Sequence, residues 1–274
     1  MISNQDYKIT KGYDIDVLSD VLENFDKSGT FVVPEGRNKI KKFLIKKDGK
    51  EEEINIKNFA KKNIISQIIY KYFRDSKAKR SYEYAKRLLE KNIKTPNPIA
   101  YFDNFINKET KEKKSFYISE ELKYEFTCRE VFWDEKPPAE IEEVFLNEKG
   151  KIIKEFVKFT FDLHEKGIKF EDFSPGNVLI RREKNGEYGF YLVDLNRMTF
   201  DKNMGLWERM KNVSKMIEFK KYAEEFSKEY AKLYKKPYDK VFKKLYYYIT
   251  IHKYKVWIKD STRGIRQMFK FRKS

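Results

Sequence analysis

The sequence is poor in cysteine and histidine, and it contains no long hydrophobic run. Cys128 is the only cysteine among 274 residues, so no internal disulfide can form, which indicates a reducing compartment. No group of Cys and His residues has the spacing of a metal site. The longest apolar stretches, such as 64–70, are too short to cross a bilayer, and the first residues lack the apolar segment of a signal peptide. These absences predict a cytoplasmic protein.

Positive charge and aromatic residues are abundant. Lys and Arg total 60 against 43 Asp and Glu, which gives a net charge of +17. This balance favours anionic partners such as nucleotide phosphates, lipid headgroups, nucleic acid or acidic glycans, but does not choose among them. Since 40% of the residues are hydrophobic and 16% are aromatic, the chain can fill the core of one large or two-lobed domain.

The most informative stretch runs from Leu163 to Phe200. Asp172 is followed five residues later by Asn177, and Asp194 follows the next predicted hairpin. In the kinase signature, an Asp and an Asn at this spacing form a catalytic loop, in which the Asp accepts the proton of the acceptor hydroxyl and the Asn holds magnesium. A later Asp also holds magnesium. The spacing therefore predicts Asp172 as a catalytic residue, Asn177 and Asp194 as metal ligands, and ATP and Mg²⁺ as cofactors.

The residues around this stretch predict suitable elements. Apolar residues recur at helical spacing up to Leu163, and Gly167 follows where a left-handed C-cap places glycine. Strands are predicted over 177–180 and 188–193, with Asn185-Gly186 as the turn between them. The simpler alternative is a polar loop beside an ordinary hairpin. His164, near the helix end, is predicted to be a packed or capping residue rather than a base.

The N-terminal part predicts a small antiparallel sheet. A short amphipathic helix is expected within residues 1–28, followed by strands over 30–33, 40–46 and 53–57. Lys57 on the third strand is the candidate for the lysine that binds nucleotide phosphates. The turn before the second strand is predicted to cover the phosphates with Gly36, its only glycine, so the G-x-G-x-x-G pattern is absent. Arg37 and Asn38 are candidate phosphate donors instead.

Two helices and a second pair of strands are expected next. Helices are predicted over 58–74 and 76–91, and Glu83 in the second is the candidate partner of Lys57. Strands over 99–106 and 115–119 lead to residues 120–123. There the backbone groups of Glu120 and Leu122 are candidates for binding an adenine edge.

The C-terminal part is predicted to be mainly helical. Helices are expected from 127–133, 149–166 and within 204–254, and the sequence Ala-Pro-Glu that ends the activation segment of protein kinases is absent. The chain therefore predicts an α+β, bilobal, protein-kinase-like fold. Its expected lobes are residues 1–122, with an antiparallel sheet and a short N-terminal extension, and residues 123–274, with the catalytic loop and a basic tail.

Five segments carry a resemblance to a known family, the Kdo/WaaP-type lipopolysaccharide core kinases. They are RSYEYAKRLLEK (80–91), TPNPIAY (95–101), LHEKGI (163–168), DFSPGNVL (172–179) and VDLNRMTF (193–200). The resemblance covers roughly residues 30–235. It implies ATP-dependent phosphorylation of a sugar hydroxyl on a lipid-linked glycan at the inner face of the cytoplasmic membrane. Phe170, Glu171 and Asn196 replace the His, Arg and Gly of protein kinases, which disfavours control by an activation-loop phosphate.

Two alternatives remain open at this level. A non-catalytic, pseudokinase-like basic module that binds membrane or nucleic acid is the alternative function, although it would need none of Asp172, Asn177 and Asp194. Their presence together favours the kinase and disfavours nucleic acid as the partner. The tail from Ile251 interleaves aromatic and aliphatic residues with Lys and Arg, which suits either peripheral contact with an anionic membrane or a final helix packed on the fold. No obligate protein partner is evident.

Overall fold

The computed structural model describes residues 6–34, 36, 38–60 and 75–271, and side chains as far as Thr262. The chain folds into two compact units. Unit 1 comprises Met1–Lys123 and Tyr191–Arg197, and unit 2 comprises Tyr124–Phe190 and Met198–Ser274. The division into lobes of residues 1–122 and 123–274 stays a prediction.

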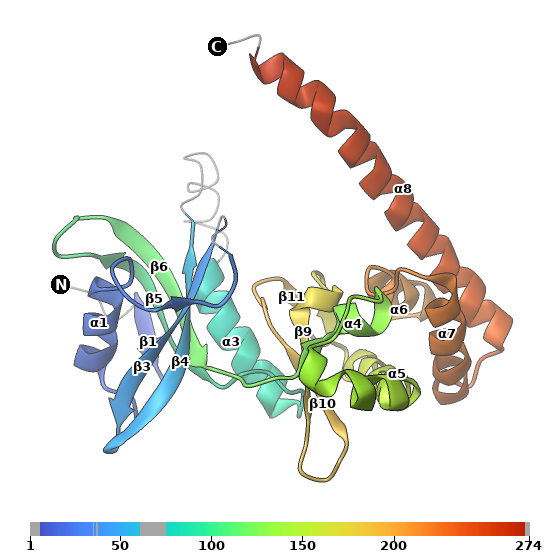
Figure 1. Cartoon of the computed structure of the whole chain (residues 1–274), viewed down its shortest axis with the longest axis horizontal. Coiled ribbons are helices and arrows are strands. Elements are labelled where there is room, and N and C mark those ends of the chain that lie inside the picture. The colour runs from blue at the N-terminus through green and yellow to red at the C-terminus, as the bar shows by residue number, and fades with distance from the viewer. Residues whose placement is uncertain (1–5, 35, 37, 61–74, 272–274) are drawn as a thin grey trace. The chain divides into compact units, whose positions relative to one another are not determined.

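Unit 1 is built on a six-stranded antiparallel sheet (Figure 1). Its strands follow the order β1-β5-β6-β4-β3-β2. The bounds are β1 Tyr7–Ile9, β2 Thr30–Phe31, β3 Lys39–Lys47, β4 Lys50–Phe59, β5 Pro98–Ile106 and β6 Lys113–Glu120. The turn between β3 and β4 places Asp48 and Gly49 at φ 50° and 75°, which matches the tight hairpin turns that need two left-handed residues.

Within the described part of unit 1, two helices flank this sheet. In α1 (Ile15–Glu23), Asp14 caps the N-terminus and Leu18 and Leu22 are buried. The second helix, α3 (Lys77–Glu90), begins at Ser76, whose side chain accepts from the backbone N–H of Lys79. Both caps satisfy amide groups that a helix start leaves unpaired. The core beneath α1 consists of aliphatic and aromatic side chains, among them Phe25, Phe43, Ile54, Ile56, Ile99, Phe102, Phe116 and Ile118.

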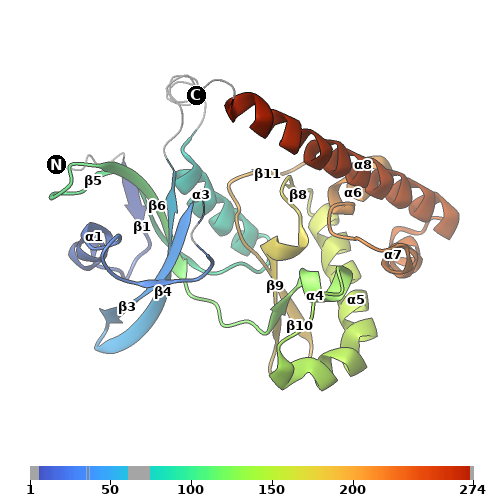
Figure 2. The same cartoon turned by 45° about the horizontal axis from the view of Figure 1, so that its top comes forward.

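Unit 2 is mainly helical. Its helices are α4 (Cys128–Phe132), α5 (Glu142–Glu165), α6 (Leu206–Val213), α7 (Lys220–Tyr234) and α8 (Tyr238–Phe271), with short 3-10 turns η1 (Ala139–Ile141) and η2 (Pro175–Asn177) (Figure 2). The short strands are β7 (Phe126–Thr127), β8 (Lys169–Phe170), β9 (Val178–Arg182), β10 (Tyr188–Leu192) and β11 (Met198–Thr199). They form a β10-β9-β7 sheet and a β11-β8 pair.

An aromatic cluster fills the core of unit 2. Phe156 on α5 packs near Phe132, Phe173, Phe190 and Phe226, with ring centroids 4.9 to 6.4 Å apart. These rings come from α4, α7, β10 and the loop before η2. Because each ring buries a large apolar area, the cluster holds the loop that begins at Phe170 against α5.

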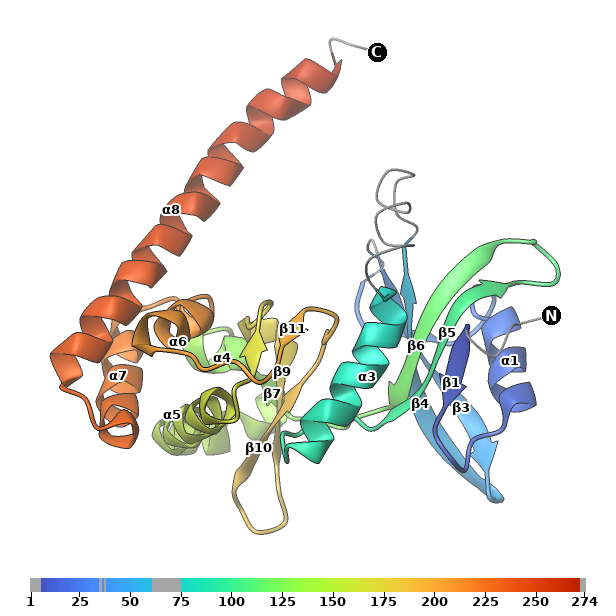
Figure 3. The same cartoon turned by 180° about the vertical axis from the view of Figure 1, so that it is seen from behind.

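Among the side chains of α8 that the structure describes, those in the first turns are the buried ones. Val241, Leu245 and Ile249 recur every four residues and are buried, and this half of α8 contacts α6 and α7. Residues 253–261 are all exposed, and the helix runs on past α6 and α7 (Figure 3). The alternative that the tail from Ile251 packs on the fold is therefore wrong for residues 253–261. None of the described helices is long and apolar enough to span a bilayer.

Most predicted elements are confirmed, with some shifted limits. The strands predicted over 30–33, 40–46, 53–57, 99–106 and 115–119 form as β2 to β6. The helices predicted over 76–91, 127–133 and 149–166 also form, and the last begins earlier, at Glu142. Strand β1 was not predicted. Asn58 and Phe59 end β4 instead of starting a helix, and the rest of the predicted helix, 61–74, lies outside the described residues.

Candidate functional site

In unit 1, Lys57 and Asp194 form a direct ion pair. The Nζ atom of Lys57 donates to Oδ1 of Asp194 over 2.6 Å. Along β4, Ile54 and Ile56 point into the core beneath α1, so the alternation of strand side chains turns Lys57 to the opposite face of the sheet, together with Phe59. Lys57 is only 9% exposed. A lysine this deeply placed needs a negative partner, and Asp194 supplies it.

Backbone conformation sets the position of Asp194. This residue follows β10 with φ 58°, a left-handed conformation that only Asp, Asn and Gly adopt without large cost. Asn196 donates a second hydrogen bond to Oδ1 of Asp194, over 2.6 Å. Both described donors reach Oδ1, and the side chain of Asp194 is 37% exposed. The carboxylate therefore keeps an oxygen of the kind that Mg²⁺ prefers.

The predicted ion pair between Lys57 and Glu83 is wrong. Glu83 pairs instead with Lys8 on β1, at 2.9 Å, and this bond raises the pKa of Lys8. Tyr82 and Ala85 occupy the buried face of α3, which leaves Glu83 on a neighbouring, more exposed stripe. The strand β1 passes that stripe, and it was absent from the prediction. Among the residues that the structure describes, Glu83 pairs with Lys8 and Lys57 pairs with Asp194, so Glu83 does not position Lys57.

The other residues predicted to contact the nucleotide are Glu120, Leu122, Gly36 and Arg37, and the structure places them differently. The backbone N–H of Glu120 donates to the carbonyl of Asn97 over 2.9 Å, so it is not available to an adenine ring. Among the described residues, no backbone carbonyl accepts from Leu122, which leaves Leu122 as the better candidate. Gly36 is exposed, and a Cβ added there would meet only the carbonyl of Pro34 at 3.9 Å. Arg37 lies outside the described residues.

In unit 2, the loop from Asp172 to Asn177 is closed by its own hydrogen bonds. The side-chain amide of Asn177 donates to the carbonyl of Asp172 over 2.8 Å. Its backbone N–H donates to the carbonyl of Ser174 over 2.9 Å, at the η2 turn. The two residues predicted from the Asp-x-x-x-x-Asn spacing are thus held together by direct contact. Asn177 and Asp194 belong to different units, and their joint binding of magnesium stays a prediction.

A buried chain of polar side chains lies behind this loop. The Nδ2 atom of Asn212, on α6, donates to the carbonyl of Phe170 over 2.6 Å. The Oδ1 atom of Asn212 lies 3.3 Å from Nε2 of His164, and Nδ1 of His164 lies 2.8 Å from the hydroxyl of Tyr230. Because an amide oxygen can only accept, Nε2 must carry the proton and the Tyr230 hydroxyl must donate to Nδ1.

His164 is therefore a structural residue, as predicted. It is 1% exposed, and burial lowers its pKa to about 3, so the ring is neutral at physiological pH. A neutral His164 with both nitrogens bonded cannot act as a base toward a substrate. Asn212 was not predicted as a functional residue, although a polar residue next to the buried positions Arg209, Met210 and Val213 of α6 is a usable signal.

The described residues offer no site for a tightly held metal cluster or a reactive thiol. No group of three or more His, Cys, Asp or Glu residues is arranged for a metal within the described part of the chain. Cys128 is fully buried, and burial raises the pKa of its thiol, which keeps it unreactive. A kinase-type Mg²⁺, held by one or two protein oxygens plus phosphates, does not need such a group.

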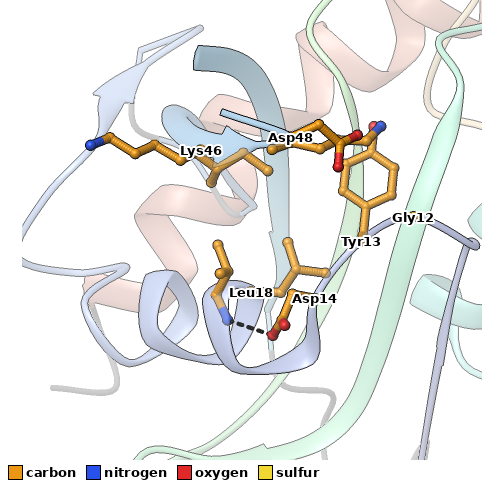
Figure 4. Close-up of a pocket in the computed structure, with 9 residues that line it drawn as sticks. Gly12, Tyr13, Asp14, Leu18, Lys46 and Asp48 are labelled. Carbon is orange, nitrogen blue, oxygen red and sulfur yellow. Dashed lines mark hydrogen bonds between the residues drawn. The ribbon is translucent and has the colours of Figure 1, made fainter. Parts of the chain in front are cut away.

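One pocket of about 130 Å³ lies in unit 1 between α1 and the turn that joins β3 to β4 (Figure 4). Tyr13 and Asp14 line it, with Lys46, Lys47 and Asp48 from the turn. The ammonium of Lys47 stands 3.7 Å from the centre of the Tyr13 ring and 3.4 Å from a carboxylate oxygen of Glu52, so Lys47 is already paired. None of the predicted site residues lines this pocket, and it takes no part in the function inferred below.

Comparisons with known proteins agree on the fold. A family model described as "Lipopolysaccharide kinase (Kdo/WaaP) family" matches residues 26–238. The solved structure of "WaaP in complex with acyl carrier protein" is similar, with a TM-score of 0.56 and 14% identity. The similarity covers 91% of this chain and 97% of that one, and at this identity it shows the kinase-like fold alone. No curated protein matches the sequence.

Proposed function

The chain belongs to the lipopolysaccharide kinase (Kdo/WaaP) family, and from this premise we propose that it transfers the γ-phosphoryl group of ATP to a sugar hydroxyl. The acceptor is the core of lipopolysaccharide or a related lipid-linked glycan. One observation carries most of the weight: Lys57, on β4, pairs at 2.6 Å with Asp194, which the sequence predicts as a metal ligand. A binding module without catalysis has no need of this ion pair.

The roles of the residues follow from their chemistry. Lys57 binds the phosphates of the nucleotide, exchanging the carboxylate of Asp194 for phosphate oxygens. Asp194 and Asn177 hold Mg²⁺ through a carboxylate and an amide oxygen. Asp172 accepts the hydrogen bond of the acceptor hydroxyl and orients its oxygen toward the phosphoryl group. When bound, Mg²⁺ supplies neutralisation of the charge on the transferring phosphate. The backbone of Leu122 is the proposed contact for adenine.

Two single substitutions separate metal binding from proton handling. Asp194→Ala removes a direct ligand, so we expect it to abolish Mg²⁺-dependent ATP binding. Asp172→Ala leaves that binding nearly intact and suppresses turnover, with a residual rate because Asp172 mainly orients the hydroxyl. Calorimetric titration with ATP and Mg²⁺, paired with transfer of labelled phosphate to extracted lipopolysaccharide, measures both. Equal loss of binding in the two variants would refute these assignments.

We also propose that α8 brings the protein to the membrane that carries its acceptor. Tyr247, Tyr254 and Ile258 lie along one face of the helix, and their side chains are 54%, 60% and 39% exposed. Trp257 is 63% exposed and its ring stacks on Tyr254, with centroids 5.8 Å apart. Large aromatic side chains left in water on a basic helix suit the headgroup region of an anionic bilayer.

The basic residues of the same segment add electrostatic attraction. Lys255 and Lys259 are exposed on the neighbouring stripe, while Lys253 pairs with Glu218 at 3.1 Å. Each lysine near an anionic surface contributes about 1 kcal/mol, and salt screens this attraction. Membrane contact through α8 is therefore expected to weaken as the salt concentration rises.

Vesicle binding tests this contact. The double substitution Tyr254→Ser and Trp257→Ser should lower binding to phosphatidylglycerol vesicles at least severalfold and leave ATP binding unchanged. Truncation after Thr250 should do the same, because Val241, Leu245 and Ile249 keep α8 packed. The matched control is Leu44→Ser, which removes an equally exposed apolar side chain, 61% exposed, from β3. Unchanged binding of both α8 variants would contradict the proposal.

A further inference from the structure

A glycine in the predicted catalytic loop lies directly against an arginine. A Cβ built on Gly176 would stand 2.6 Å from Nη2, 2.9 Å from Cζ and 3.1 Å from Nε of Arg129. Because three atoms of one guanidinium lie within 3.1 Å of this position, the guanidinium turns a face toward the place where a Cβ of residue 176 would stand. Gly176 immediately precedes Asn177, and its φ is not in the left-handed region, so backbone conformation does not call for glycine there; the missing side chain instead leaves the room that the guanidinium occupies.

The short helix α4 fixes the position of Arg129. Thr127 and Glu130 form a reciprocal capping box at its N-terminus, and this motif ties down both the cap and the third residue. Cys128, Val131 and Phe132 are buried, so these neighbours anchor the helix in the core and leave Arg129 on its exposed side. The helix lies beside β9 (Figure 2), the strand that starts where the loop ends.

No acidic side chain of the described structure neutralises the charge of Arg129. Glu130, the nearest acid in sequence, accepts from the backbone N–H and the hydroxyl of Thr127. Among the described residues, no carboxylate forms an ion pair with the guanidinium of Arg129. A second cation borders the same loop: Nζ of Lys215 donates to the carbonyl of Glu171 over 3.0 Å. The loop that holds Asp172 is thus flanked by positive charge.

We infer that Arg129 forms a subsite for an anionic group of the acceptor, a phosphate or a carboxylate on a sugar near the hydroxyl that is phosphorylated. A guanidinium binds such planar or tetrahedral anions through two parallel N–H donors. The inference rests on the proposed function and deepens it by naming the acceptor as an acidic glycan. Arg129 shares unit 2 with Asp172, the residue assigned to the acceptor, whereas Lys57 and Asp194, assigned to the nucleotide, belong to unit 1.

The probe for this subsite is the deacylated core oligosaccharide of lipopolysaccharide, offered to the full chain in the presence of ADP and Mg²⁺. It is used in three forms: intact, treated with phosphatase, and with its carboxyl groups reduced to alcohols. Affinity is measured by calorimetry, and phosphoryl transfer by steady-state kinetics with ATP. Binding is thereby read separately from chemistry.

Arg129→Ala should weaken binding of the intact oligosaccharide, and raise its KM, about tenfold to a hundredfold, the usual size of a lost charge-assisted contact. The KM for ATP should change less than twofold. Arg129→Lys should recover part of the loss. The wild type should suffer the same loss on whichever treated oligosaccharide lacks the recognised group, and Arg129→Ala should then add nothing further, which identifies phosphate or carboxylate as the ligand.

Two controls make the result specific. Lys184→Ala removes one exposed charge from the β9–β10 turn of the same unit and should leave affinity unchanged. Gly176→Ala displaces the guanidinium without removing its charge, so it should weaken binding in the wild type. It should add no further loss of affinity when combined with Arg129→Ala.

The outcomes separate this inference from the proposed function. If the wild type binds the oligosaccharide but transfers no phosphate to it, the proposed function fails while the subsite stands. If the wild type phosphorylates the oligosaccharide and Arg129→Ala binds it normally, the subsite is refuted while the function stands. A rise in the KM for ATP alone would assign Arg129 to the nucleotide and would also overturn the inference, as would a wild type that neither binds nor phosphorylates the oligosaccharide.

Discussion

Replacing Asn212 with alanine should both destabilise the fold and slow catalysis. Asn212 is 6% exposed, and its amide makes two buried contacts, as donor to the carbonyl of Phe170 at 2.6 Å and as acceptor from Nε2 of His164 at 3.3 Å. Alanine lacks the amide group, so both hydrogen bonds are lost at once. It leaves a buried carbonyl and a buried ring N–H without a hydrogen bond.

The expected cost follows from these two orphaned groups. A buried polar group that loses its partner costs about 1–3 kcal/mol, so the two groups together cost about 2–6 kcal/mol. That is a large share of the roughly 5–15 kcal/mol by which a domain is stable. Phe170 precedes Asp172 by two residues, and displacement of a catalytic group by about 1 Å can cost a hundredfold in rate. Turnover should therefore fall by at least tenfold in the variant that remains folded.

Urea denaturation followed by circular dichroism measures the stability, and phosphate transfer at low temperature, where the variant is folded, measures turnover. The matched control is Thr160→Val on α5. Thr160 is fully buried, and within the described residues its hydroxyl has no hydrogen-bond partner, so removal of the hydroxyl should cost little. If Asn212→Ala matched Thr160→Val in stability and retained full turnover, the supporting role of the buried chain would be refuted.

Three further predictions address other parts of the account. Lys57→Met should lower turnover by one to two orders of magnitude or more, the scale of a lost charge on the phosphates; a normal rate would move this role to another lysine. Between pH 6.5 and 5 the unfolded state binds a proton that buried His164 does not, so stability should fall with falling pH by up to about 1.4 kcal/mol per unit. Urea titrations across this range should show a shallower slope for His164→Asn. Gly167→Ala, whose Cβ would stand 2.9 Å from the backbone nitrogen of Lys202 at φ 67°, should lower the melting temperature more than Gly186→Ala, where φ is 81° and nothing lies within 4 Å.

Local sequence signals accounted for most of the fold. The turn at Lys47–Lys50, the C-cap at Gly167 and the hairpin turn at Asn185-Gly186 each carry residues suited to left-handed conformations, and φ is positive at Asp48, Gly49, Gly167 and Gly186. Such positions define where elements end, and alternating or helical apolar patterns define what lies between them. The strand that was missed, β1, has three residues and pairs with β5, with Tyr7 opposite Phe102. So distant a pairing leaves no local pattern to recognise.

The residues of the candidate site also fall into those that local sequence signals predict and those that depend on distant contacts. Lys57 and Asp194 were predicted from residue type and place on an element, and the structure brings them into contact. The partner of Glu83 could not be predicted, because it depends on β1. Arg129 and Gly176 are 47 positions apart, and only the fold shows that glycine is needed for the guanidinium to reach the loop. Contacts between distant side chains depend on tertiary packing, which the spacing of residues within one segment does not encode.

The central claim is that this chain phosphorylates a lipid-linked glycan and that Asp172 is its catalytic residue. The most direct measurement is the mass spectrum of lipopolysaccharide core extracted from cells that lack the intact gene and express either the wild type or Asp172→Ala. The account predicts that the core from wild-type cells is heavier by one phosphoryl group, placed on a sugar by fragmentation, and that the Asp172→Ala core lacks it. Identical glycan masses in the two strains, with both proteins folded and able to bind ATP, would contradict the claim.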